Sequence, residues 1–432
     1  MTGLYLYDDE QARSFEPFAL TRPVGELVAG AALQRDRWQT ALQLPVVAHI
    51  TAPHLADFEE PGAVGSARGG IPAGSVVVNS RFVPKLTAAT ASSKGDEHGL
   101  PDLWIARGRT VAVRTTRELP VDYFANGRMP LEEVARTSAE TTMLEGWWLD
   151  EVWHLIALLE EQLADDLVFL QRPGLAGAIT PRYGPPPAHA TVIGAHPVLI
   201  ASGHTSAGSV VIHGATIEPH VVFDATHGPI HVGLGSTVQA STRLVGPCYV
   251  GRNSTVLGDR LTACSIGDVC KVRGEMSHTI MLGHANKGHD GFVGHSYLGR
   301  WVNIGAGTIT SNLKNTYGPV PLWTPTGRKN TGLQFLGSLF GDHAKTGIGT
   351  CLTTGTVVGA GSNLFGSGVP PKVVPPFVWG PGSDGAYSTY QLDKFLEVAE
   401  RVMARRQVTL TPDMRRQLAA AHAARWKMET SE

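Results

Sequence analysis

From residue 192 onward, the sequence repeatedly places an aliphatic or aromatic residue directly before a glycine. Many of these positions recur at intervals of six residues, as in the run Phe340, Thr346, Leu352 and Val358. This hexapeptide spacing predicts a parallel β-helix, in which an inward side chain fills each coil and a small residue permits the tight corner that follows. An all-β domain with ordinary glycine turns is the alternative, but antiparallel hairpins need alternating side chains and less regular turn spacings.

The hexapeptide pattern lapses over two stretches, residues 272–289 and 311–333. Insertions into a solenoid usually lie on one face, and this is often the binding face. The two stretches bracket residues 286–315, so we expect this segment to form a binding face of the β-helix.

Short apolar runs alternate with helical patterns before residue 170. We predict strands at residues 4–7, 45–50, 75–79 and 105–113, a helix at 25–42, and a long amphipathic segment at 144–170. This alternation is typical of an α/β domain with a mostly parallel sheet. Because ligands bind such sheets at the carboxyl ends of the strands, we expect a pocket near Asp8, Asp9, Arg22 and Asn79.

Composition argues against several kinds of partner. Lys plus Arg number 36 and Asp plus Glu number 38, so no net charge draws the chain to nucleic acid or to an anionic membrane. The four cysteines form no CxxC pair, which argues against a zinc ribbon and a secreted disulfide framework. The N-terminus does not read as a signal peptide, and no apolar run approaches the roughly 20 residues of a membrane span. We therefore expect a cytoplasmic protein.

Three motifs stand close together in the predicted binding face. They are Asn-Lys-Gly-His at 286–289, Val-Gly-His-Ser-Tyr-Leu-Gly at 293–299 and Asn-Ile-Gly-Ala-Gly-Thr-Ile-Thr at 303–310. Together they resemble the acetyltransferase part of the bifunctional GlmU-type enzymes, which are glucosamine-1-phosphate N-acetyltransferases and N-acetylglucosamine-1-phosphate uridylyltransferases. The runs at residues 6–13 and 18–27 resemble an alternate bacterial branch of sugar nucleotidyltransferases of this kind.

The resemblance and the sequence pattern together divide the chain into three parts. Residues 1–184 are expected to form an α/β nucleotidyltransferase-like, Rossmann-like domain, and residues 188–368 a left-handed parallel β-helix with acyltransferase activity. Residues 369–432 are expected to form a C-terminal helical extension, with helices at 389–405 and 414–428, and the prolines at 185–187 would form a linker. The resemblance also implies a homotrimer with active sites between subunits, and acetyl-CoA as the donor.

The resemblance implies catalytic roles for His289 and Asn312. His289 would be the base, because an amine must lose a proton before it attacks a thioester and imidazole titrates near neutral pH. Asn312 would orient the amine or the histidine, and Asn303 would contact the sugar. Ala306 would lie where the pantetheine of the donor passes, and Ser311 is the second residue that we assign to the cofactor.

The acceptor would be a sugar phosphate, with glucosamine-1-phosphate as the first candidate. Its other predicted ligands are Arg252, Glu275, Lys287, Phe292 and Lys314. Arg252 matches a phosphate-binding arginine and Glu275 matches a family glutamate, whereas Phe292 replaces a family tyrosine. Ser277 replaces the phosphate-binding lysine of the family. The missing charge could come from Lys271, Arg273, Lys287 or Lys314.

The N-terminal domain departs further from the family. The glycine-rich loop that cradles nucleotide phosphates is replaced by the acidic sequence at residues 7–13. Asp8 and Asp9 would repel a triphosphate unless Mg²⁺ lay between them, Arg22 could replace a lost lysine, and Asn79 lies where the usual enzymes have a metal-binding aspartate. The domain could use UTP or another nucleoside triphosphate in a rearranged site, bind a nucleotide sugar only, or have lost activity.

Two other functions fit parts of the sequence. The γ-type carbonic anhydrases share the β-helix and bind a metal through three histidines, and His284, His289 and His295 are close in sequence. We nevertheless assign no metal-ligand set, because the motif at 303–312 is typical of acyl transfer. The other alternative is a trimeric scaffold that binds a nucleotide sugar without turnover.

Overall fold

The computed structural model describes residues 2–88, 102–135, 140–170, 191–192, 199–201, 210–212, 214–366, 368–380 and 387–426. The chain divides into two compact units, one of Met1–Val152 with Leu410–Ala424 and the other of Trp153–Thr409 with Arg425–Glu432. The expected C-terminal extension is therefore shared between them, since helix α5 (Leu392–Ala404) belongs to the second unit and helix α6 (Pro412–Ala424) to the first. The predicted linker at 185–187 lies outside the described residues.

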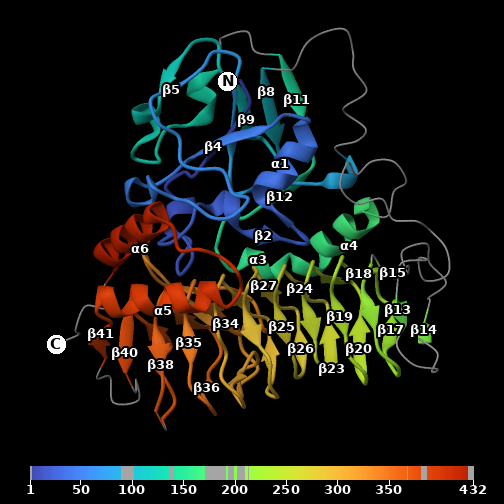
Figure 1. The fold of residues 1–432 in the computed structure, drawn as a ribbon. Coiled ribbons are helices and arrows are strands. Elements are labelled where there is room, and N and C mark those ends of the chain that lie inside the picture. The colour runs from blue at the N-terminus through green and yellow to red at the C-terminus, as the bar shows by residue number, and fades with distance from the viewer. Residues whose placement is uncertain are drawn as a thin grey trace. The chain divides into compact units, whose positions relative to one another are not determined.

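The first unit is built on a six-stranded sheet with the order β11-β8-β9-β6-β1-β4 (Figure 1). Its strands are β1 (Leu4–Tyr7), β4 (Val46–Ile50), β6 (Val76–Asn79), β8 (Leu103–Ala106), β9 (Arg109–Arg114) and β11 (Thr141–Met143). Strand β1 runs parallel to β4 and β6, whereas β9 runs antiparallel to β6 and β8. The sheet is thus mixed: β4-β1-β6 and β11-β8 have the parallel order expected of it, and β9 runs antiparallel between these two parts.

Smaller elements complete the first unit. They are the strands β2 (Val28–Ala29), β3 (Ala32–Leu33), β5 (Gly70–Ile71), β7 (Phe82–Pro84), β10 (Leu119–Pro120) and β12 (Gly146–Trp148), the helix α1 (Gln34–Leu42), and short 3-10 helices at Ala12–Ser14, Val24–Glu26, Pro53–Leu55, Val121–Phe124 and Leu131–Val134.

Two predicted helical segments are wrong in part. The helix expected from residue 25 begins only at Gln34, because β2 and β3 form a hairpin around Gly30, whose φ of 64° is accessible to glycine at no steric cost. The segment expected at 144–170 begins with strand β12, where two tryptophans suit a pleated and buried surface. It continues as α3 (His154–Ala157) and α4 (Leu159–Leu170), which belong to the second unit.

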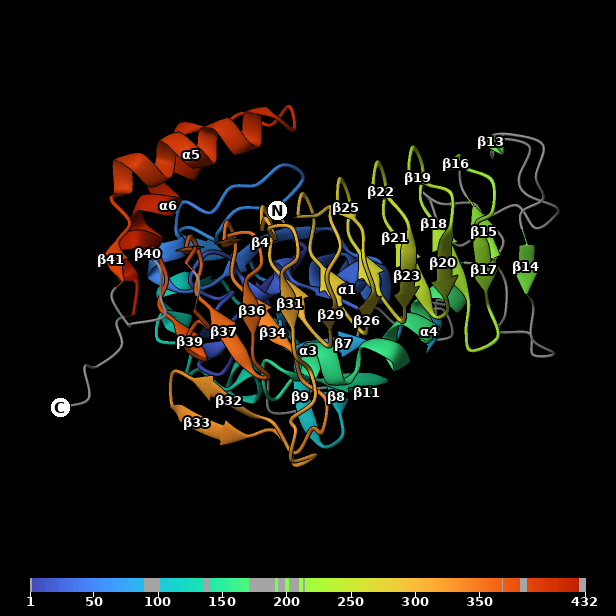
Figure 2. The same ribbon diagram turned by 90° about the horizontal axis from the view of Figure 1, so that it is seen from below.

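The second unit contains the predicted parallel β-helix, whose coils follow one another along the stack (Figures 1 and 2). Three sheets form its sides, which we name E, F and G. Sheet E contains β13 (Thr191–Val192), β16 (Thr216–Ile217), β19 (Thr237–Val238), β22 (Thr255–Val256), β25 (Lys271–Val272), β28 (Asn286–Lys287), β35 (Lys345–Thr346), β38 (Asn363–Leu364), β40 (Val378–Gly380) and β41 (Ser388–Thr389). Sheet F contains β14 (Leu199–Ala201), β17 (Val222–Asp224), β20 (Thr242–Val245), β23 (Asp259–Thr262), β26 (Met276–Ser277), β29 (Val293–Gly294), β31 (Ile309–Thr310) and β36 (Cys351–Leu352). Sheet G contains β15 (Val210–Ile212), β18 (Ile230–Val232), β21 (Cys248–Val250), β24 (Ser265–Ile266), β27 (Ile280–Met281), β30 (Tyr297–Leu298), β34 (Ser338–Phe340), β37 (Thr356–Val358) and β39 (Val373–Val374).

Of the two expected breaks in the repeat, one is wrong and one is confirmed. Residues 272–289 continue the coils without interruption, since β25, β26, β27 and β28 all pair in register with the preceding coil. The sequence pattern lapses there because Met276, Met281 and Lys287 fill the inward positions. Residues 311–333 do leave the coil, and they carry the hairpin of β32 (Pro321–Thr324) and β33 (Gly327–Asn330), which projects from the stack in Figure 2.

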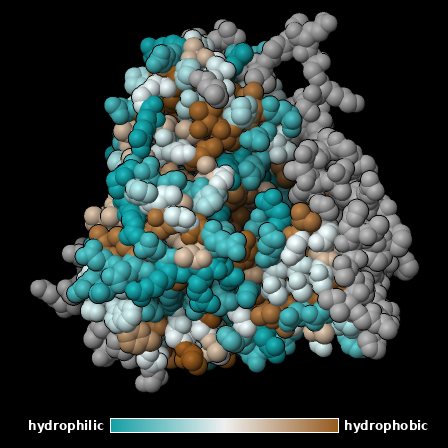
Figure 3. Space-filling view, in the orientation of Figure 1, coloured by the Kyte–Doolittle hydropathy of each residue, from teal (hydrophilic) through white to brown (hydrophobic). Residues whose placement is uncertain are grey.

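None of the helices in the described ranges has both the length and the apolar character needed to cross a bilayer. The face drawn in Figure 3 is a mixture of hydrophilic and hydrophobic residues, without one continuous apolar surface.

Candidate functional site

Strand register assigns each candidate residue of the β-helix to a face or an edge. On sheet E, one row of residues points outward: Lys271, Asn286, Asn303, Lys345 and Asn363. The residue that follows each of these points inward and is buried: Val272, Lys287, Ile304, Thr346 and Leu364. Asn286 donates a hydrogen bond from Nδ2 to Oδ1 of Asn303 at 2.8 Å. The predicted sugar ligand Asn303 is therefore held on the outer face of sheet E.

His289 and Ala306 lie on consecutive coils at the edge between sheets E and F. His289 is exposed. The amide of Gly307 donates to the carbonyl of Asp290 at 3.0 Å, and the amide of Gly349 donates to the carbonyl of Ala306 at 2.8 Å. The first bond stacks the corner of Ala306 directly on the corner of His289, and the second joins Ala306 to the following coil. The structure thus brings the predicted base next to one predicted cofactor residue.

Lys287 is the one predicted phosphate ligand whose side chain points into the β-helix. The side chain is fully buried, and its ammonium donates to the carbonyl of Arg273 at 2.9 Å and to the carbonyl of His289. Burial lowers the pKa of Lys287 to about 8. Lys287 therefore ties two successive E–F corners together below His289, and its charge is directed to backbone oxygens instead of solvent.

Replacing Lys287 by methionine is expected to remove a pH dependence of stability. Since its pKa is about 8 in the fold against an ordinary 10.5, the unfolded chain holds more protons between these pH values, and stability should rise with pH by up to about 3 kcal/mol. Urea unfolding at pH 7.5 and pH 10 would measure this contribution as the difference in gain between wild type and Lys287→Met, because Lys345, whose pKa burial also lowers to about 8, contributes equally to both proteins. The exposed neighbour Lys271→Met is the matched control, and an equal gain in all three proteins would contradict the assignment.

The outward row of sheet F carries two more predicted ligands, Glu275 and Phe292. Its register joins Arg260, Glu275, Phe292, Ile309 and Cys351 on successive coils. Glu275 forms an ion pair with Arg260. Ser311, the second predicted cofactor residue, is exposed where the chain leaves β31 at the end of the same sheet.

Asn312 lies at the edge between sheets F and G, where it contacts His295. Its Nδ2 is 2.9 Å from Nδ1 of His295. The His295 ring stacks on His278 at 4.5 Å and on Phe335 at 5.3 Å between centroids. Burial, followed by the charge of His278, lowers the pKa of His295 to about 4, which keeps the ring neutral. Asn312 therefore orients His295, a role that the sequence did not suggest. In the part of the chain that the structure describes, Asn312 makes no hydrogen bond to His289.

Gly294 shapes the surface between Phe292 and Asn312. A Cβ atom on this glycine would lie 2.5 Å from the Phe292 ring and 2.7 Å from Nδ2 of Asn312. Both side chains therefore lie over a position without a side chain, and a Cβ atom there would require them to move. The structure brings these two predicted residues together on sheet F.

The remaining predicted cations are paired or lie elsewhere. Arg252 lies at the edge between sheets G and E and forms an ion pair of 3.0 Å with Asp268. Arg273 pairs with Asp290 at 2.8 Å. Lys314 lies in the inserted segment, where its Nζ donates to the carbonyl of Pro319 at 3.2 Å. Of the four cations proposed to replace the missing lysine, Lys271 alone keeps an exposed place in the sheet E row.

The three histidines considered as metal ligands lie on three different edges. His284 packs against Trp301 at the G–E edge with their rings tilted by 36°, His289 lies at the E–F edge and His295 at the F–G edge. They do not converge within one chain, and no group of three His, Cys, Asp or Glu suited to a metal occurs in the part of the chain that the structure describes. The carbonic anhydrase alternative is not supported.

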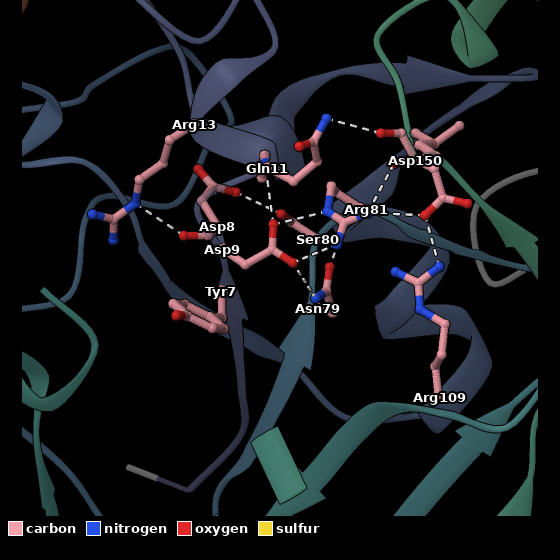
Figure 4. A network of polar contacts seen from close by, with 12 residues as sticks. Tyr7, Asp8, Asp9, Gln11, Arg13, Asn79, Ser80, Arg81, Arg109 and Asp150 are labelled. Carbon is pink, nitrogen blue, oxygen red and sulfur yellow. Dashed lines mark hydrogen bonds and ion pairs between the residues drawn. The ribbon is translucent and has the colours of Figure 1, made fainter. Parts of the chain in front are cut away.

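In the first unit, Asp8 connects the carboxyl ends of β1, β4 and β6, and Figure 4 shows it beside Ser80. It follows β1, and its carboxylate accepts hydrogen bonds from Ser80 after β6 at 2.6 Å and from Thr51 after β4 at 2.7 Å. Burial raises the pKa of Asp8 despite these bonds. Asp8 is thus enclosed by protein donors and serves to join the strands.

Asp9 and Asn79 meet as predicted, but a third residue, Arg81, dominates their contacts (Figure 4). Arg81 donates from Nε and Nη2 to the two oxygens of Asp9 at 2.8 and 2.6 Å, and Asn79 donates to Asp9 at 2.9 Å. Burial acts to raise the pKa of Asp9, but the hydrogen bonds and charge of Arg81 outweigh it and bring this pKa below its ordinary value. A bidentate arginine pair of this kind is a strong charge-assisted contact.

Arg22 is not part of this group. It forms a two-pronged ion pair with Glu60 at 3.0 and 3.2 Å. The sequence also gave no sign of Arg109 and Asp150, which pair at 2.6 Å beside Arg81, with the Arg109 guanidinium 3.6 Å above the ring of Trp148. These residues are more than 25 positions from β1 and β6, so only the tertiary fold could identify them.

Fold and site together define a two-part protein, in which an α/β unit with polar residues at the ends of its parallel strands accompanies a parallel β-helix. Residues 4–173 match the family described as sugar nucleotidyl transferase, so the N-terminal part carries a nucleotidyltransferase domain. Over part of its length the chain is similar to GlmU proteins. It is 31% identical over 119 residues to the bifunctional protein GlmU of Methanococcus vannielii, covering 27% of each chain. It is 34% identical over 179 residues to the protein of that name from Desulfitobacterium hafniense, covering 39% of this chain and 33% of that one.

The chain matches only about a quarter to a third of the length of these relatives. Among solved structures, the Arabidopsis UDP-N-acetylglucosamine acyltransferase is similar at 14% identity and a TM-score of 0.22, over 52% of this chain and 80% of that one.

Proposed function

We propose that the β-helix is a sugar-phosphate N-acetyltransferase that uses acetyl-CoA, with glucosamine-1-phosphate as the first acceptor to test. The observation that carries the proposal is the E–F edge, where exposed His289 lies one coil from Ala306 and beside the amide pair of Asn286 and Asn303. The exposed imidazole suits a general base, and the small residue on the next coil leaves room for the extended pantetheine of acetyl-CoA. The neighbouring amides suit the hydroxyl groups of a sugar.

In this reaction His289 takes a proton from the ammonium group of the acceptor. The freed nitrogen lone pair attacks the carbonyl carbon of the thioester, and the carbon–sulfur bond breaks as the amide bond forms. The nitrogen loses its second proton as the amide forms, the departing thiolate takes up one proton, and His289 releases the other to solvent, so the products are the N-acetylated sugar phosphate, free CoA and one proton. General-base help of this kind contributes roughly 10²–10⁴ in rate.

We also propose that the protein works as a homotrimer with sites between subunits. Its predicted site residues are spread around the coil: His289 lies at the E–F edge, Phe292 on sheet F and Asn312 at the F–G edge. Packing of identical β-helices side by side would bring different edges of neighbouring chains together. The distribution of residues within one chain supports such an arrangement.

For the first unit we propose a divergent sugar-1-phosphate nucleotidyltransferase that takes UTP or another nucleoside triphosphate. Its residues do not fit a protein-held Mg²⁺, because both oxygens of Asp9 accept hydrogen bonds from Arg81 and the oxygens of Asp8 accept bonds from Ser80 and Thr51. A magnesium ion in this reaction would have to be carried by the phosphates of the nucleotide.

The cytoplasmic location expected from the cysteines stays a prediction.

A coupled assay on the full chain tests both activities. Release of free thiol from acetyl-CoA that depends on glucosamine-1-phosphate is expected, and formation of a UDP-sugar after addition of UTP and Mg²⁺ would establish the first unit as an enzyme. Binding of acetyl-CoA and sugar phosphate without thiol release would refute catalysis and favour the scaffold alternative. A panel of amino-sugar phosphates would identify the acceptor.

A further inference from the structure

The outward row of sheet E contains a cation that no predicted role uses. Lys345 follows Asn303 and precedes Asn363 in register. Its Nζ donates to the carbonyl of His343 at 2.9 Å. Among the described residues no carboxylate lies within ion-pair distance of it. Two of the three ammonium hydrogens of Lys345 are therefore left for another acceptor.

The neighbours of Lys345 also offer donors. The Oδ1 atom of Asn303 accepts from Asn286, which leaves the amide NH₂ group of Asn303 without a partner in the described ranges. Asn363 makes no side-chain hydrogen bond to another described residue and is partly exposed. Since adjacent strands lie about 4.8 Å apart, these three side chains place an ammonium and two amides within roughly 10 Å along one face.

The environment of Lys345 favours a ligand of opposite charge. The side chain is partly buried, and this burial lowers its pKa to about 8. An ammonium that has lost much of its water without gaining a carboxylate is costly to the fold, and an anion bound beside it would offset that cost. Trp379 follows Asn363 in register and is 41% exposed, and its ring packs edge-to-face against Phe365 and Tyr390.

From these contacts we propose that Asn303, Lys345 and Asn363 form a binding site for the phosphate group of an organic phosphate on the outer face of sheet E. This site rests on the proposed acetyl transfer and adds to it, because Lys345 lies on the coil that follows Ala306, and Ala306 lies one coil from His289. Lys345 would supply the positive charge that is missing where Ser277 replaces the phosphate-binding lysine. The phosphate could belong to the sugar or to CoA, and both present the same oxygens to the site.

Calorimetric titration of the full chain with glucosamine-1-phosphate, with CoA and with inorganic phosphate tests the site without turnover. Lys345→Met is expected to weaken binding of the phosphate source that uses the site by roughly tenfold or more, the effect of losing a charged hydrogen bond. A loss confined to glucosamine-1-phosphate would assign the site to the acceptor, and a loss confined to CoA would assign it to the donor. Unchanged affinity for every ligand would overturn the proposal.

Two further variants guard against a folding effect. Asn363→Asp keeps the size of the side chain and provides Lys345 with an internal carboxylate, so it should also weaken phosphate binding. Lys394→Met removes an exposed lysine of α5 that faces Glu397 and should change nothing. If Lys271→Met weakens binding and Lys345→Met does not, the site is placed wrongly. If phosphate binding depends on Lys345 but the protein does not transfer acetyl groups, the proposed function is refuted and the phosphate site stands. If acetyl transfer occurs but neither turnover nor phosphate binding changes in Lys345→Met, the phosphate site is refuted and the proposed function stands.

Discussion

Replacing His289 by alanine is expected to lower the kcat of acetyl transfer by roughly 10²–10⁴-fold while the β-helix stays folded. The side chain is exposed at the E–F corner, so its removal leaves no cavity. The contacts that hold the corner use backbone groups, namely the carbonyl of His289 with Lys287 and the carbonyl of Asp290 with Gly307. Alanine keeps all of them. Thiol release from acetyl-CoA at saturating acceptor would measure the loss.

A matched control separates chemistry from surface change. His227 is exposed in the loop between β17 and β18 of the same β-helix, so His227→Ala removes an exposed imidazole from another coil and should keep full activity. Retained activity in His289→Ala would refute the assignment of the base. His295→Ala would then be the next variant to test, because Asn312 orients that ring.

The β-helix and the central strands could be predicted because their signals are local. Inward residues six positions apart predict the coils of the β-helix, and short apolar runs predict the strands β1, β4 and β6. The positions of site residues around the coil could not be predicted in the same way. They depend on how many residues each corner and insertion takes up, and a shift of one residue turns a side chain from the outer face to the core.

Lys287 and Asn312 illustrate this dependence. The sequence placed Lys287 among the ligands of a phosphate, but register turns it inward, where it holds the corner of His289 from below. Asn312 follows His289 closely in sequence, yet it lies one coil later and one edge further, beside His295. Physical neighbours in a solenoid are set by coil number and by edge, which the sequence reports only where the hexapeptide pattern is intact.

Arg81 is the clearest case of a site residue that no local pattern could reveal. It contacts Asp9 across 72 positions of sequence, and it lies two residues beyond the end of β6 just as Asp9 lies two residues beyond the end of β1. Replacing Arg81 by methionine is expected to destabilise the first unit by more than the roughly 1 kcal/mol of an exposed ion pair and by less than the about 3–5 kcal/mol of a fully buried one, because the Asp9 side chain is 19% exposed. Arg81 is 6% exposed, and Asp9 would keep its charge with only Asn79 and one backbone amide as donors.

Urea unfolding of the full chain, followed for the transition of the first unit, would measure this loss and its pH dependence. Since Arg81 holds the pKa of Asp9 below its ordinary value, the stability that the pair contributes is present above that ordinary value. It should disappear as the pH falls through the lowered pKa in the fold. The difference in free energy of unfolding between wild type and Arg81→Met should therefore become smaller at acid pH. Arg68→Met removes the exposed partner of Asp57 and should cost less than about 1 kcal/mol. If Arg81→Met costs no more than Arg68→Met, or if its cost does not change with pH, the Asp9–Arg81 ion pair does not stabilise the first unit as proposed.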